Sequence, residues 1–330
     1  MKKVTCISYH NSGSGAVDDY LREYSGIEFA PSDVECRFLQ DPDGISDLEY
    51  NLVDNWHRLN SGFALKRYER FARLKKRTYS LIFGDSWEVE TEKYIKSLVS
   101  FEFPGYWHAD IDEQPFYSWF IFKCRRALTK VMPANFRKSQ DYNYFPKLHS
   151  YHTRVSREEF YKVTQNYCEA LCNSISHVET EYVVLDQCVS TTNIQRYLNY
   201  INDLKIIIVD RDPRDLYIDC IRSGDHVLPH NPHFFAIQYR DMRRNEELEL
   251  QNSNVLKIQF EDLIYHYDTT TSRIIDFLGL HKETHLHPKK YFDPNISIKN
   301  TQIWKSDSRF AEQLKVIEEE LFDYFYIMNP

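Results

Sequence analysis

The sequence predicts an α/β protein with a central parallel sheet flanked by helices, of the P-loop-NTPase-like type, and with a large, mostly helical insertion. Short β-branched runs alternate with helical segments near both ends of the chain, which is the pattern of a parallel sheet covered on both faces. Between these regions, residues 44–176 have mostly helical periodicity. Only 9 glycines among 330 residues indicate a helix-rich chain with few tight turns.

The first elements of the sheet are predicted at the N-terminus. Residues 4–9 are a short apolar run ended by turn residues, as in a buried strand. A helix over residues 15–24 and a weaker strand over residues 27–30 follow. We therefore expect residues 1–30 to supply one part of the sheet and residues 180–265 the other, within a single domain that spans the chain.

The insertion is predicted as a series of helices. Ser156 and Glu159 have the spacing of a capping box, so a long helix is expected to begin there and to run to about residue 175. Residues 106–114 and 149–152 are polar and aromatic and are predicted as loops. The other helices of the insertion are expected over residues 45–59, 64–76, 87–101 and 116–131.

The second half of the sheet is predicted after residue 180. Pro213 is placed as in the first turn of a helix. Strands are expected over residues 182–185, 205–209 and 255–260, and further helices over residues 192–200, 234–248, 271–278 and 309–326.

Composition restricts the classes of partner. A net charge of −8 argues against nucleic acid as the main partner, because neutralising phosphates needs a basic surface. The seven cysteines are scattered and form no CxxC, so we expect free thiols and no metal site. The first strand begins near residue 3 and no apolar run reaches the roughly 18 residues of a membrane span, so a cytoplasmic protein is expected. The oligomeric state does not follow from the sequence.

The turn after the first strand, within "SYHNSGSGAV" (residues 8–17), has the position of a phosphate-binding loop. Strand, Ser/Gly turn and helix N-terminus place backbone N–H groups and the positive end of a helix dipole around one point, and Ser12 and Ser14 add hydroxyl donors. Unlike a P-loop, this loop has no lysine. On its own it fits an anion site and a tight turn equally well.

A second segment, "LKIIIVDRDPRD" (residues 204–215), favours the anion site. Its apolar strand ends at Asp210, so Arg211 projects from the carboxyl end of a central strand, where open α/β sheets bind ligands. The planar guanidinium also suits phosphate. The structural alternative for Arg211 is an ion pair with Asp212 or Asp215.

These segments, in this order, resemble those of the sulfotransferases that use 3′-phosphoadenosine-5′-phosphosulfate (PAPS), as in a divergent bacterial-type member. "SGSGAV" (12–17) resembles the family's loop for the 5′-phosphosulfate, and "RDPRD" (211–215) resembles its strand end for the 3′-phosphate. "VLKIQFEDLIYHYDTTTSRIIDFLGL" (255–280) and "IKNTQIWKSDSRFAEQLKVIEE" (298–319) resemble later segments of the family, the last of which covers the nucleotide.

The resemblance implies a PAPS donor, its product adenosine 3′,5′-bisphosphate (PAP), a hydroxyl acceptor and no metal. It also implies that residues 44–176 bind the acceptor and that residues 266–330 cover the nucleotide. The donor-binding residues that it implies are Asn11, Ser12, Gly13, Ser14, Gly15, Ala16, Arg211, Asp219, Ser223, Lys299, Asn300, Trp304 and Lys305.

Three positions depart from the pattern of the family. The loop cation falls at Asn11, the serine of the 3′-phosphate site at Asp219, and a lysine that follows a later strand at Gln187. A carboxylate that faces a phosphate is repelled by roughly 1–4 kcal/mol at a few ångströms. Either Asp219 points away and Ser223 or Arg222 serves instead, or the donor has no 3′-phosphate.

Sulfuryl transfer needs a base for the acceptor proton and positive charge at the transferring group. Glycan-modifying members of the family place a glutamate about two dozen residues after the loop cation, which corresponds to Glu35. Members that act on small phenols and alcohols use a histidine from the middle of the chain, for which His108 is the candidate. His10, as an imidazolium, or Lys299 or Lys305 could supply the missing loop charge.

The leading hypothesis is a PAPS-dependent sulfotransferase that acts on a hydroxyl, on a carbohydrate or glycan. A nucleotide-dependent phosphotransferase of related fold is the first alternative, and it would explain Asp219. The second alternative is a catalytically silent relative that binds ligands without transfer, which the residues Asn11 and Asp219 together favour.

Overall fold

The computed structural model describes residues 1–30, 34–133, 148–224 and 226–328. Five parallel strands form a sheet in the order β2-β5-β1-β6-β7, which confirms the predicted fold class. The strands lie close to the predicted ranges, at β1 (Lys2–Ser8), β2 (Ile27–Phe29), β5 (Tyr182–Val184), β6 (Leu204–Asp210) and β7 (Val255–Gln259).

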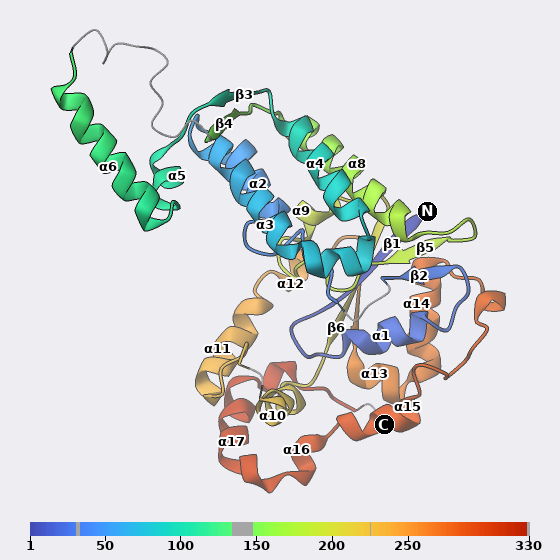
Figure 1. Ribbon diagram of the computed structural model, residues 1–330. Coiled ribbons are helices and arrows are strands. Elements are labelled where there is room, and N and C mark those ends of the chain that lie inside the picture. The colour runs from blue at the N-terminus through green and yellow to red at the C-terminus, as the bar shows by residue number, and fades with distance from the viewer. Residues whose placement is uncertain (31–33, 134–147, 225, 329–330) are drawn as a thin grey trace.

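Alternate residues of the central strands face two separate layers of helices (Figure 1). Along β6, Ile206 and Ile208 pack into one apolar cluster, and Ile207 and Val209 into the other. This follows because successive side chains of a strand point to opposite faces of the sheet. The first layer contains α3 (Asn60–Phe83), α4 (Ser86–Leu98), α8 (Arg157–Ile175) and α9 (Ile194–Leu198); the second contains α1 (Ser14–Leu21), α13 (Phe260–Tyr265) and α14 (Tyr267–Leu278).

The insertion between β2 and β5 is mostly helical where the structure describes it, as predicted. The helix expected over residues 45–59 is shorter: α2 (Ile45–Glu49) continues into a π-helical turn (Tyr50–Asp54) and then ends. Tertiary contacts account for the early end, because the indole Nε1 of Trp56 donates a hydrogen bond to the carbonyl oxygen of Thr153 at 2.7 Å. This bond holds the next residues against the far end of the insertion instead of in a helix.

Both loops predicted within the insertion are wrong. Residues His149–His152 form a strand, β4, paired antiparallel with β3 (Phe101–Pro104), and residues His108–Asp112 form a short helix, α5. The strand depends on a partner far away in the chain, which local sequence does not encode. The short helix is fixed by Asp110, whose carboxylate accepts a hydrogen bond from the backbone N–H of Trp107 at 2.7 Å and pairs with Lys66.

A third group of helices lies at the carboxyl end of the sheet. The helix expected over residues 234–248 is divided at Arg243, whose guanidinium is buried against the carboxylate of Asp210 at the end of β6. The chain has to leave the helix there to bring the two charges together. The helices of this group are α10 (Pro213–Ser223), α11 (Pro232–Met242), α12 (Glu246–Glu249), α15 (Pro294–Ser297), α16 (Ile303–Ser306) and α17 (Ala311–Glu320).

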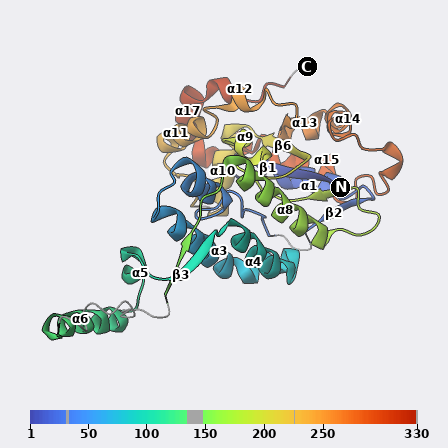
Figure 2. The ribbon, with the colours of Figure 1, turned by 90° about the horizontal axis from the view of Figure 1, so that it is seen from above.

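An arm leaves the main body beside β3 and β4. It carries α5 and α6 (Phe116–Val131), and Figure 2 shows α6 well clear of the helices that cover the sheet. In the part of the chain that the structure describes, no helix is long and apolar enough to cross a membrane.

The capping box at the start of α8 provides a test of the local sequence signal. The Ser156 hydroxyl accepts a hydrogen bond from the backbone N–H of Glu159 at 3.2 Å, and the Glu159 carboxylate accepts one from the backbone N–H of Ser156 at 2.8 Å. Ser156→Ala should therefore lower the free energy of unfolding by about 1 kcal/mol, measured by urea denaturation. Ser176→Ala at the other end of α8 is the control, and an equal loss in both variants would contradict the capping role.

Candidate functional site

The loop between β1 and α1 has an unusual backbone. His10, Asn11 and Gly13 all have positive φ angles, of 76°, 49° and 94°. A Cβ atom on Gly13 would lie 2.6 Å from the ring of Phe260, so glycine is required here for both conformation and space. Ala16 closes the turn by donating its backbone N–H to the carbonyl oxygen of Gly13 at 3.0 Å. The loop is therefore a tight turn that opens directly onto the N-terminus of α1.

The polar groups of the loop face different ways. Ser12 is fully buried, and its hydroxyl donates a hydrogen bond to the carbonyl oxygen of His10 at 3.2 Å, so it is directed into the protein. The Ser14 hydroxyl accepts a hydrogen bond from the side-chain amide of Gln187 at 2.7 Å. No acidic residue stands in the first turn of α1, so the helix dipole there is not compensated by the helix itself.

A cavity of about 450 Å³ opens over this loop. It brings together several residues that the sequence analysis selected, from segments far apart in the chain. The loop contributes His10, Asn11, Gly13, Ser14 and Gly15, the segment after β2 contributes Glu35, Arg37 and Gln40, and the segment after β5 contributes Gln187, Ser190 and Thr191.

Glu35 is the carboxylate of this cavity, and it is accompanied by a cation that the sequence analysis did not select. Arg37 also lines the cavity, and its Nη1 atom lies 3.2 Å from Oε2 of Glu35. Its Nε atom donates a hydrogen bond to Asp41 at 3.0 Å. The resemblance to the sulfotransferases implied a cation in the β1–α1 loop or in the C-terminal segment, whereas the structure has one two residues after Glu35. Glu35 and Arg37 are two residues apart in the sequence, and this spacing of opposite charges was the signal from which their pairing could have been predicted.

Arg211 lies beside the cavity and connects three segments. It is 5% exposed, and its guanidinium donates hydrogen bonds to the carbonyl oxygens of Asn11 at 3.3 Å and Asn300 at 2.6 Å. Its ion pair is with Asp219, at 2.5 Å, and not with Asp212 or Asp215, so that expected structural alternative is wrong. The Nε atom is buried and has no hydrogen-bond partner among the described residues.

The expected substitutes for a 3′-phosphate serine are turned to other partners. The Ser223 hydroxyl donates a hydrogen bond to the carbonyl oxygen of Cys220 at 3.1 Å. Arg222 pairs with Asp307 at 2.6 Å. The first of the two alternatives required that Asp219 point away from the phosphate site. Instead, its carboxylate is paired with the guanidinium of Arg211.

The C-terminal segment is held near α10 by Asp215. The carboxylate of Asp215 accepts hydrogen bonds from the backbone N–H groups of Gln302, at 2.6 Å, and Trp304, at 3.2 Å. The ring of Trp304 lies 4.0 Å from the guanidinium carbon of Arg214. This segment therefore packs against α10, which begins directly after the carboxyl end of β6.

The two lysines of this segment do not line the cavity over the loop. Lys299 is exposed, and the ammonium of Lys305 donates a hydrogen bond to the side chain of Gln302 at 2.7 Å. Of the three residues proposed to replace the loop cation, His10 therefore lines the cavity, whereas Lys299 and Lys305 lie outside it.

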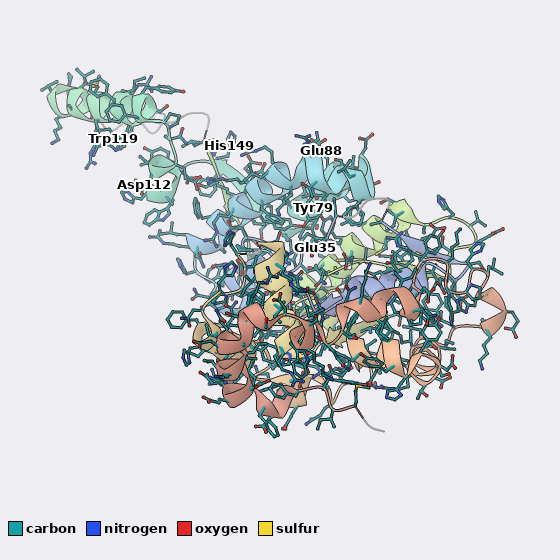
Figure 3. The ribbon with its side chains drawn as sticks, turned by 90° about the horizontal axis from the view of Figure 1, so that it is seen from below. Glu35, Tyr79, Glu88, Asp112, Trp119 and His149 are labelled. Atoms are coloured by element: carbon teal, nitrogen blue, oxygen red, sulfur yellow. The ribbon has the colours of Figure 1, made fainter. Side chains whose placement is uncertain are left out.

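His108 is the other candidate that the structure separates from the cavity. It is exposed at the start of α5, next to the ring of Trp107, within the arm. Figure 3 shows the same separation, because Asp112 of α5 and Trp119 of α6 lie in the arm while Glu35 lies in the main body. Among the described residues no group of three or more His, Cys, Asp or Glu side chains could hold a metal ion.

Two carboxyl groups, those of the buried Asp18 in α1 and the half-buried Asp186 after β5, line one small pocket together with Gly15. Burial raises the pKa of Asp18 well above its usual range. Burial, with the nearby carboxylate of Glu35, raises the pKa of Asp186 to about 6, although a hydrogen bond with Asp18 acts in the opposite direction. Both shifts favour the protonated carboxyl groups, which lowers the negative charge next to the loop.

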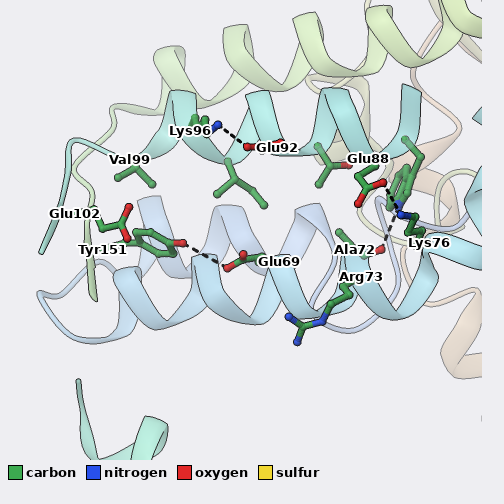
Figure 4. Close-up of a pocket in the computed structure, with 13 residues that line it drawn as sticks. Glu69, Ala72, Arg73, Lys76, Glu88, Glu92, Lys96, Val99, Glu102 and Tyr151 are labelled. Carbon is green, nitrogen blue, oxygen red and sulfur yellow. Dashed lines mark hydrogen bonds and ion pairs between the residues drawn. The ribbon is translucent and has the colours of Figure 1, made fainter. Parts of the chain in front are cut away.

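A second cavity, of about 410 Å³, lies between α3 and α4 (Figure 4). Several of its charged side chains pair with each other: Lys76 with Glu88, and Lys96 with Glu92. The Tyr151 hydroxyl donates a weak hydrogen bond to Glu69 at 3.5 Å. None of the residues selected from the sequence lines it. The cavity over the β1–α1 loop is therefore the candidate active site.

No protein-family model matches the chain, and no curated protein matches it. Among solved structures, it is similar to a sulfotransferase domain of the olefin synthase from Synechococcus PCC 7002, with a TM-score of 0.44 and 13% identity over 99% of this chain and 95% of that chain. It is also similar to a sulfotransferase domain of the curacin biosynthetic pathway, with a TM-score of 0.41 and 13% identity over 100% of this chain and 93% of that one.

A third similar structure is the sulfotransferase STF9 from Mycobacterium avium, with a TM-score of 0.38 and 12% identity over 99% of this chain and 77% of that one. TM-scores and identities this low do not establish a family or an activity. The assignment of a function therefore rests on the side chains of this protein.

The conformation of the loop leads to a prediction with a matched control. Gly13→Ala should lower the free energy of unfolding by at least about 1–2 kcal/mol, because alanine disfavours the positive φ and its Cβ meets the Phe260 ring. Gly15→Ala, two residues later in α1, has open space around the new Cβ and no positive φ, so it should be neutral or stabilising. Urea denaturation of both variants checks this, and equal stabilities would contradict the strained turn.

Proposed function

We propose that this protein is a sulfotransferase that moves the sulfuryl group of PAPS to a hydroxyl group, on a carbohydrate. The observation that supports it best is Arg211, at which the three segments that resemble sulfotransferase motifs meet. Its guanidinium contacts the loop at Asn11 and the C-terminal segment at Asn300. Its buried Nε atom, without a partner among the described residues, is suited to an anionic ligand.

Several polar groups of the cavity then have roles in transfer. The loop and the N-terminus of α1 hold the phosphosulfate through their backbone N–H groups. Arg37 and His10 place positive charge beside the transferring group. The Glu35 carboxylate takes the proton of the acceptor hydroxyl as its oxygen forms a bond to sulfur, while the bond between sulfur and the bridging phosphate oxygen breaks and PAP leaves.

The proposal that the acceptor is a carbohydrate depends on which residue is the base. Glu35 lines the cavity and His108 does not, and the glutamate is the counterpart of the base in glycan-modifying members. Its partner Arg37, at 3.2 Å, keeps the carboxylate oriented at the cavity wall. Ser190 and Thr191 line the same cavity as Glu35, and their hydroxyl groups suit a polyhydroxyl acceptor.

The ion pair between Arg211 and Asp219 favours a second candidate function. A 3′-phosphate that approaches Arg211 has to displace the Asp219 carboxylate, at 2.5 Å from the guanidinium. A ligand without that phosphate has no such competitor. The second candidate is therefore a protein of the same architecture that binds a nucleotide without a 3′-phosphate, as a phosphotransferase or as a binding protein without transfer.

Ligand-induced stabilisation separates these candidates, because a ligand that binds only the folded state raises Tm. We expect PAP to raise Tm and ATP to leave it unchanged. Asp219→Ser should enlarge the shift with PAP, since it removes a carboxylate from the phosphate site, whereas the exposed Asp241→Ser should not. A shift with ATP alone, or with adenosine 5′-phosphosulfate but not with PAP in either form, would show that the donor is not PAPS.

The base is tested by Glu35→Gln. Transfer from PAPS to a carbohydrate hydroxyl, followed as release of PAP, should fall by roughly 10²–10⁴-fold because the acceptor proton has no base, while the Tm shift with PAP stays the same. Glu28→Gln, on strand β2 and outside the cavity, is the control and should retain activity. Retained turnover in Glu35→Gln would remove this residue from the role.

A further inference from the structure

Helix α6 presents an apolar surface to solvent. Its sequence is FYSWFIFKCRRALTKV, and only Phe122 is buried. The exposed fractions of its apolar side chains reach 77% at Phe116 and 82% at Val131. Side chains of this size are normally withdrawn from water, and contiguous exposed apolar patches mark interaction surfaces.

The apolar side chains of α6 form one continuous face. At about 100° per residue, eight of its residues fall in succession within an arc of about 140°, without a charged residue among them. All eight are exposed. They are Phe116, Ala127, Phe120, Val131, Cys124, Tyr117, Leu128 and Ile121.

The charges of α6 are all positive. The helix carries no aspartate or glutamate, in a protein whose net charge is −8. The same angular arithmetic places Lys123 beside one border of the apolar face and Arg125 beyond the other, with Arg126 and Lys130 on the polar side. The ammonium of Lys123 lies over the ring of Trp119, 4.9 Å from its centre, so aromatic and basic groups share that border.

We propose that α6 binds the surface of a membrane that contains anionic phospholipids. An apolar face bordered by basic and aromatic side chains lies in the plane of such a surface, with the apolar groups at the acyl boundary and the cations at the lipid phosphates. Negative headgroups match the positive charge of the helix, and the remaining surface of the acidic protein stays in water. Attachment is peripheral, since the described chain has no membrane-spanning helix.

Charge favours this partner over a second copy of the chain. Pairing two α6 helices through their apolar faces would bring two sets of four cations together without an acidic residue on either helix. The position of the helix also suits a flat surface, because the arm holds α6 clear of the body (Figures 1 and 2) and the side chains of its apolar face are exposed. The inference does not depend on the proposed sulfotransferase activity.

Sedimentation of the full chain with phospholipid vesicles tests the proposal. We expect the protein to sediment with vesicles of phosphatidylcholine and phosphatidylserine, to stay in solution with phosphatidylcholine alone, and to be released by high salt. Arg126→Glu with Lys130→Glu should weaken binding by at least roughly tenfold. Phe120→Glu with Leu128→Glu should abolish it, whereas the control Leu74→Glu, at an exposed apolar position on α3, should bind as before.

Several outcomes would overturn the proposal. Failure to sediment with the anionic vesicles would do so, as would sedimentation that neither double variant weakens. A dimer in light scattering that the α6 double variants convert to a monomer would assign the face to a second copy instead. All substituted residues are exposed, and unchanged circular dichroism and Tm in the variants would show that a loss of binding is not a loss of fold.

Discussion

The buried guanidinium of Arg211 is the interaction on which the architecture of the candidate site depends. A buried charge is costly unless it is paired and hydrogen-bonded, so the groups around it must be held in place. Here those groups come from the β1–α1 loop, from α10 and from the C-terminal segment. The end of β6 thus fixes three segments that are far apart in the chain, and the cavity forms over the loop so positioned.

A second buried ion cluster supports the same strand end. Burial alone would raise the pKa of Asp210, but the neighbouring cations Arg243 and Lys257 hold it below its usual value. Arg243 also lies over the ring of Tyr9, 4.0 Å from its centre, and Tyr9 lines the cavity. The carboxyl edge of the sheet is therefore built from charged groups that neutralise each other, and the ion pair of Glu35 and Arg37 lines the cavity at this edge.

The arm follows a different physical principle from the body. In the body, apolar side chains of both helix layers pack against the sheet, and the charged groups at its edge are paired. In α6 the apolar face points to solvent and the cations carry no acidic neighbours on the same helix. The protein thus has a closed core with a polar cavity at one end, and an amphipathic helix, α6, outside that core. An exposed apolar face such as that of α6 is typical of a surface that binds a partner.

The sequence by itself determined the parallel sheet, because the period and length of each apolar run depend only on local residues. It also determined the capped start of α8. Tertiary structure decided the rest of the site. Whether Asp219 neutralises Arg211, whether Arg37 accompanies Glu35, and whether His108 reaches the cavity depend on how segments far apart in the chain meet. The strand β4 and the division of the α11 region at Arg243 follow the same rule, since a hydrogen-bonded strand partner and a buried ion pair are both contacts that no local pattern contains.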